Sequence, residues 1–207
     1  MKKYLIAGVL IWISISCKTV DYEWENFKYA ATPKVTLNAA ASALPTFEKA
    51  KVSFFNLADP NYATSQRFEW TLDYYDANGR SKPAEIEVYL GFNKREGTVP
   101  VFPIVLSPAG VHPNERQFPL PSTVRPTDKL YEKVTQFPKS YSLTAAEMAS
   151  FTGTALSTIG VNDYFLFKFI ITLEDGTRIV QFNDNSCDES RGELCDCRVG
   201  VRFKNIP

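Results

Sequence analysis

Apolar and polar residues alternate with a period of two along much of the chain, and this pattern predicts β-strands. Residues 66–76 show it most clearly, with every second residue apolar: Phe68, Trp70, Leu72 and Tyr74. Residues 85–92 repeat it with Ile86, Val88 and Leu90. We therefore predict half-buried strands in both ranges, with Trp70 in the core and with Tyr75 and Tyr89 on the opposite face.

Two dipeptides predict tight turns between strands. Asn78-Gly79 separates residues 66–76 from residues 85–92, and both residues tolerate the positive φ that short hairpins require. We expect these two strands to pair as a hairpin, with Tyr75 and Tyr89 on one exposed face. Asp175-Gly176 predicts a second tight turn, directly after residues 164–173. Residues 177–182 are expected to form the strand that returns from this turn.

Residues 164–173 are apolar on both faces, which predicts a central strand. Shorter strand candidates lie at residues 34–37, 51–57 and 198–203. One helix is expected at residues 145–151, because Thr144 and Glu147 have the spacing of a capping box and Gly153 follows as a stop.

These elements predict an all-β fold, an antiparallel immunoglobulin-like β-sandwich with one short helix. A barrel built from the same strands is not separated from a sandwich by pattern alone. The 15 Phe, 10 Tyr and 13 Pro agree with an all-β chain. The body of the fold is expected at residues 33–207 as one domain, with a long Pro-rich surface connection at residues 107–129.

The balance of charged residues bears on whether nucleic acid is a partner. The chain has 23 Lys and Arg against 23 Asp and Glu, and no basic patch stands out. A nucleic-acid partner is therefore not expected.

The first residues have the pattern of an export signal. Lys2 and Lys3 precede an apolar run at residues 5–13, which is too short to cross a bilayer, and small residues lead to Cys17. The arrangement resembles a bacterial lipoprotein signal, which implies that residues 1–16 are removed and that Cys17 is lipidated. The alternative is an ordinary secreted protein with an incidental Cys17.

Residues 17–32 are expected to act as a tether. Asp21, Glu23 and Glu25 make it acidic, which resembles the export cue of surface lipoproteins in Bacteroidota. Trp24 in this segment is a candidate partner contact, and the alternative is that it packs back on the domain.

A wider resemblance rests on the segments SLTAAEMAS (residues 142–150) and GVNDYFLFKFIITLEDG (residues 160–176). Together they resemble Bacteroidota outer-membrane surface lipoproteins encoded with SusC/SusD-type systems, of the SusE/SusF-like accessory kind. The resemblance implies a lipid-anchored protein at the cell surface. It also implies SusC/SusD-type outer-membrane proteins, or another envelope protein, as partners.

The remaining cysteines suggest a disulfide. Cys187, Cys195 and Cys197 lie in an exported and therefore oxidising context. One bridge is expected, between Cys187 and Cys197 or between Cys187 and Cys195, and zinc-ligand spacing is absent. Neighbouring acids could hold Ca²⁺, although solvated loop acids are commoner. The candidates are Asp184, Asp188 and Glu189.

Candidate catalytic chemistry is sparse, and no cofactor motif is present. The single histidine, His112, lies in the Pro-rich region with no nucleophile motif beside it. Outward carboxylates on the first two long strands could in principle form a glycosidase pair, namely Glu69, Asp73, Glu85 and Glu87. We expect a protein that binds rather than catalyses. Its primary expected role is accessory subunit of an uptake or assembly complex, and glycan binding through Tyr75 and Tyr89 is the alternative.

Overall fold

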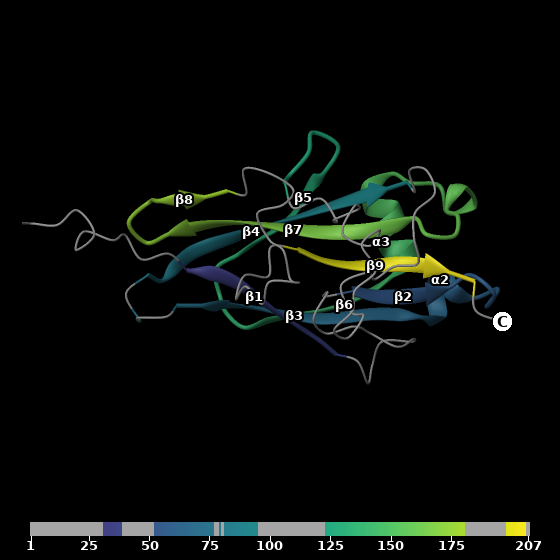
Figure 1. The fold of residues 1–207 in the computed structure, drawn as a ribbon, viewed down its shortest axis with the longest axis horizontal. Helices are drawn as coiled ribbons and strands as arrows, with labels where there is room; N and C mark the ends of the chain where they lie inside the picture. Colours follow the sequence, from purple (N-terminus) through teal and green to yellow (C-terminus); the bar gives the residue numbers. More distant parts are fainter. Residues whose placement is uncertain are drawn as a thin grey trace, which may run out of the picture.

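The computed structural model describes residues 31–38, 52–76, 79, 81–94, 123–180 and 198–205. Within them two β-sheets stack face to face (Figure 1). The strands are β1 (Thr32–Leu37), β2 (Val52–Asn56), β3 (Arg67–Tyr75), β4 (Pro83–Asn93), β5 (Lys129–Val134), β6 (Lys139–Thr144), β7 (Tyr164–Leu173), β8 (Arg178–Ile179) and β9 (Arg198–Lys204). The helical elements are α2 (Tyr62–Ser65), α3 (Ala145–Thr152) and the short 3-10 turn η4 (Leu156–Thr158).

The small sheet contains three strands in the order β1-β3-β6, and the large sheet has the order β2-β9-β7-β4-β5. Strand β8 also belongs to the large sheet and pairs with β7 beyond the residues that β9 occupies. The predicted all-β sandwich with one short capped helix is confirmed. The pairing is antiparallel throughout the described strands except between β2 and β9, which run parallel.

The core lies between the sheets and follows the alternation seen in the sequence. Phe68, Trp70 and Leu72 of β3 are buried, as are the inward residues of β4, β7 and β9. Trp70 stacks on Tyr141 of β6 with ring centroids 4.3 Å apart, and it also meets Phe167 of β7 at 5.1 Å. Strand β7 lies between β4 and β9, as its two apolar faces predicted.

The predicted helix is present with its cap. The Glu147 amide donates to Thr144 Oγ1 at 3.2 Å, and the Thr144 amide donates to Glu147 Oε2 at 2.7 Å. Gly153 ends the helix in the left-handed region at φ 81°. These contacts satisfy backbone groups that a helix end otherwise leaves unpaired.

The hairpin predicted at Asn78-Gly79 is wrong. Strand β3 pairs with β1 and β6, whereas β4 pairs with β5 and β7, so the connection crosses from one sheet to the other. Gly79 does adopt positive φ, at 62°. Positive φ permits a sharp reversal but does not choose the partner strand, and here each strand buries its apolar face against the opposite sheet. The turn at Gly176, with φ 84°, does join the paired strands β7 and β8.

Candidate binding surface

The outer face of the large sheet is largely buried, although it carries charged residues. The residues buried on this face belong to β2, β4, β7 and β9, and they are Phe54, Glu87, Leu166, Lys168, Ile170, Arg198 and Arg202. Isolated buried charges are costly, so such groups are expected to have partners inside the domain.

Lys168 and Asp128 form the most deeply buried of the described ion pairs. Lys168 Nζ lies 2.7 Å from Asp128 Oδ2, and the two side chains are 0% and 2% exposed. Lys168 also donates to the Thr123 carbonyl, and the Arg125 amide donates to Asp128 Oδ2, both at 2.7 Å. These contacts hold segment 123–128 against the outer faces of β7 and β4. It approaches so closely that a methyl group at Gly91 would overlap the Asp128 carboxylate.

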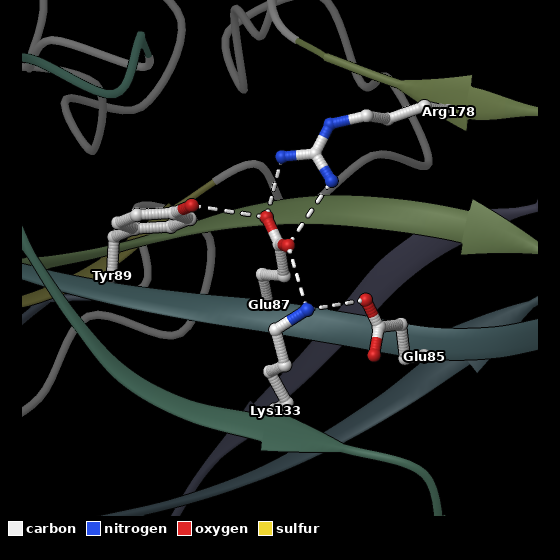
Figure 2. A network of polar contacts seen from close by, with 5 residues as sticks. All are labelled: Glu85, Glu87, Tyr89, Lys133 and Arg178. Carbon is white, nitrogen blue, oxygen red and sulfur yellow. Dashed lines mark hydrogen bonds and ion pairs between the residues drawn. The ribbon is translucent and has the colours of Figure 1, made fainter.

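Glu87 is the centre of a second network on the same face (Figure 2). Its carboxylate accepts two hydrogen bonds from Arg178 of β8, at 2.6 and 3.0 Å, and one from the Tyr89 hydroxyl at 3.0 Å. Lys133 of β5 lies 3.2 Å from Glu87 Oε1 and also donates to Glu85. The Arg178 hydrogen bonds, ahead of those from Lys133 and Tyr89, lower the pKa of Glu87 to about 2 despite its burial.

The arginine at position 202 lies further along this face. It is 3% exposed and faces the Tyr164 ring at 5.3 Å. Burial lowers the pKa of Arg202 to about 10, because desolvation disfavours the charged form. Burial also lowers the pKa of Lys204, and repulsion from Arg202 adds to this effect.

The outer face of the small sheet is different, because its described outward side chains are mostly polar and are exposed or half-buried. Thr36, Thr71 and Ser140 lie in one row across β1, β3 and β6, and the Thr71 and Ser140 hydroxyls are 2.9 Å apart. In the next row Asn38 and Ser142 both donate to Glu69, at 3.1 and 2.7 Å. Arg67 in turn donates to the Ser142 hydroxyl at 2.6 Å. The result is an ordered, exposed polar surface.

A hollow adjoins this surface where β3 ends. Its volume is about 450 Å³, and its lining residues are Asp73, Tyr74, Tyr75, Asp76, Gly79, Lys82 and Phe137. Tyr74 and Phe137 meet edge to face, with centroids 5.5 Å apart, and give the hollow an apolar side. Tyr75 is 42% exposed at its rim. Aromatic surface beside a few polar groups is the usual composition of a small ligand site.

The structure separates the two tyrosines that the sequence placed on one face. Tyr75 points outward from the small sheet, whereas Tyr89 points outward from the large sheet, so they lie on opposite sides of the sandwich. Tyr89 is half-buried, and its hydroxyl is committed to Glu87. Burial and the nearby Glu87 carboxylate raise the pKa of Tyr89.

The same correction applies to the outward carboxylates. Glu69 and Asp73 lie on the outer face of the small sheet, while Glu85 and Glu87 lie on the outer face of the large sheet. The crossing between β3 and β4 therefore keeps the two groups apart.

Several candidate residues fall outside the described part of the chain, and the statements about them stay predictions. They are Cys17, Trp24, His112, Asp184, Cys187, Asp188, Glu189, Cys195 and Cys197. Among the described residues, no three His, Cys, Asp or Glu side chains are grouped so that they could hold a metal ion. None of the helices in that part has the length and apolar character needed to cross a bilayer.

Sequence reasoning missed Lys82 and Phe137, which line the hollow from segments distant from Tyr75. It also missed the burial of Glu87. One signal for the latter was available: Leu166 and Ile170 on the outer face of the central strand indicate that this face is covered.

Comparison with known proteins found no match among protein-family models, curated proteins or solved structures.

Proposed function

We propose that this chain is a lipid-anchored accessory protein of the outer membrane that acts by binding. It presents the outer face of the small sheet to a SusC/SusD-type protein or to another envelope protein. One observation carries the proposal: among the described residues, the outward side chains of the small sheet are exposed or half-buried, whereas most outward side chains of β7, β9 and β2 on the large sheet are buried.

The exposed face has the properties of a contact surface. Its hydroxyl, amide and carboxylate groups are held in register by strand pairing. Tyr75 adds an exposed ring at one end, and tyrosine is enriched where proteins meet. The anchor in this proposal is Cys17, on the strength of the residues that precede it.

Copurification tests the proposal. The full-length protein, extracted from outer membranes in detergent, is expected to retain an integral membrane partner. Thr71→Lys places a long charged side chain in the middle of the exposed face and should abolish retention. Leu130→Lys is the matched control, because Leu130 is 43% exposed on β5 of the other sheet. Equal retention by both variants would exclude the small sheet as the contact surface.

The anchor has a test of its own. Labelled palmitate should be incorporated into the wild-type protein and not into Cys17→Ala. Unchanged labelling in the variant would contradict lipidation at this residue.

Glycan binding is the second candidate, and the hollow favours it. Tyr75 offers a ring for stacking on a sugar, with Asp73, Asp76 and Lys82 nearby as hydrogen-bonding groups. Signal on a glycan array should then disappear in Tyr75→Ala. Tyr89→Ala serves as the control, because Tyr89 lies on the opposite side of the sandwich.

A further inference from the structure

The hollow lies at the end of the sandwich where the chain enters the fold. Thr32, the first residue of β1, pairs with Tyr75, the last residue of β3. The turns after β3 and β7 are at this same end, because the Glu174 amide donates to the Lys82 carbonyl at 3.0 Å (Figure 1). The chain from Cys17 to Thr32 can span at most about 50 Å. A lipid on Cys17 would therefore tether the protein by the end that carries the hollow.

Acidic groups predominate among the described residues of this end. Glu174 and Asp175 are exposed in the β7–β8 turn, and Asp73 and Asp76 line the hollow. The cations at this end are Lys34 and Lys82, which are exposed, and Lys139 and Arg178, whose charges are paired with Glu132 and Glu87. Such a surface is repelled by anionic lipid headgroups and complements a basic protein surface.

The hollow combines an aromatic ring with carboxylates. Tyr75 is exposed at the rim, and Tyr74 with Phe137 forms an apolar side against which an alkyl stem can pack. Asp73 accepts the Tyr74 amide through Oδ1 at 2.9 Å, and its Oδ2 has no hydrogen-bond partner among the described residues. The Ser81 amide holds Asp76 Oδ2 at 2.8 Å, which fixes that carboxylate beside the hollow.

We propose that this hollow receives an arginine side chain of the membrane partner. The inference rests on the proposed function and identifies the chemistry of its contact. A guanidinium group is planar and always charged, so it stacks on an aromatic face and donates in a fork to a carboxylate. Lysine has the charge but not the plane or the fork, which makes arginine the better fit to Tyr75 beside Asp73.

A titration followed by ¹⁵N chemical shifts tests this chemistry. The full-length lipidated protein in detergent micelles is titrated with Nα-acetylarginine amide, and the citrulline analogue is the neutral control of nearly the same shape. Saturable shifts are expected at the amides of Tyr75, Gly79 and Lys82, with affinity in the millimolar range. The citrulline analogue should bind at least tenfold more weakly.

Matched variants locate the site. Asp73→Asn should weaken arginine binding at least fivefold, and Tyr75→Ala should weaken it several-fold. Glu85→Gln removes a carboxylate on the outer face of the other sheet and should leave the affinity unchanged. Thermal melts of each variant separate loss of binding from loss of folding.

Three results would overturn the inference. They are equal binding of the arginine and citrulline probes, no saturable shift with either, or arginine affinity insensitive to Asp73→Asn. Copurification of the Asp73→Asn/Asp76→Asn variant distinguishes the two proposals. If this variant retains the partner, the arginine contact is excluded and the accessory role still holds. If the wild-type protein retains no partner, the accessory role itself is excluded.

Discussion

Outward polar residues occur on both sheets of this sandwich, but their environments differ between the two outer faces. On the small sheet the outward side chains of β3 are exposed or half-buried, and they form hydrogen bonds along the surface. On the large sheet the outward Lys168 and Glu87 are buried and held by ion pairs. The comparison shows that outward polar residues of a strand need not be surface residues. Their environment depends on what the rest of the chain lays over the sheet.

The largest change in stability is expected when the buried carboxylate of Asp128 is removed. Asp128→Ala should lower the free energy of unfolding by about 3–5 kcal/mol, because it deprives the buried Lys168 of its charged partner. Urea denaturation monitored by tryptophan fluorescence measures the change. A loss below about 1 kcal/mol would show that the pair contributes no more than a surface ion pair does.

Gly91→Ala tests the close contact between segment 123–128 and β4. The added methyl group meets the Asp128 carboxylate, so we expect a loss of up to about 3 kcal/mol. In the double variant with Asp128→Ala, this cost should largely disappear, because the group that the methyl displaces is gone. Additive losses would contradict the described approach of segment 123–128 to β4.

The Glu87 network predicts a dependence on pH. The pKa of Glu87 is about 2 in the folded chain and ordinarily about 4.5, so its contribution is complete above pH 4.5 and declines as pH falls toward 2. Glu87→Gln should cost about 2 kcal/mol at pH 7 and progressively less below pH 4.5. Chemical denaturation at a series of pH values measures this difference. Glu85→Gln, two residues away with a more exposed ion pair, should show a much smaller effect at every pH.

The smallest effect is expected on the small sheet. Ser140→Ala removes the hydroxyl bonded to Thr71, and the unfolding free energy should change by no more than about 0.5 kcal/mol, because water replaces the lost partner. The same denaturation assay provides the measurement. A loss comparable to that of Asp128→Ala would mean that the small sheet's outer face is itself covered.

The sequence pattern predicted those features of the fold that depend only on residues close together in the chain. The inward positions Phe68, Trp70 and Leu72 follow from alternation, and the cap at Thr144 follows from a three-residue spacing. The pairing of β3 did not follow, because Asn78-Gly79 and Asp175-Gly176 carry the same conformational signal but serve a crossing in one case and a hairpin in the other.

The candidate site was less accessible to sequence reasoning than the fold. Tyr75 was identified from its outward position, but the hollow beside it requires Phe137 and Lys82, which come from other connections. Their convergence is set by how the two sheets stack. Periodicity along one strand carries no information about that stacking.

The parallel pairing of β2 with β9 has a consequence for how the protein is made. Strand β9 lies between β2 and β7, so among the described strands β2 gains its neighbour only when Arg198–Lys204 are in place. During synthesis β2 must therefore wait for Arg198–Lys204 before it can pair, and the large sheet closes late. Such long-range closure slows folding.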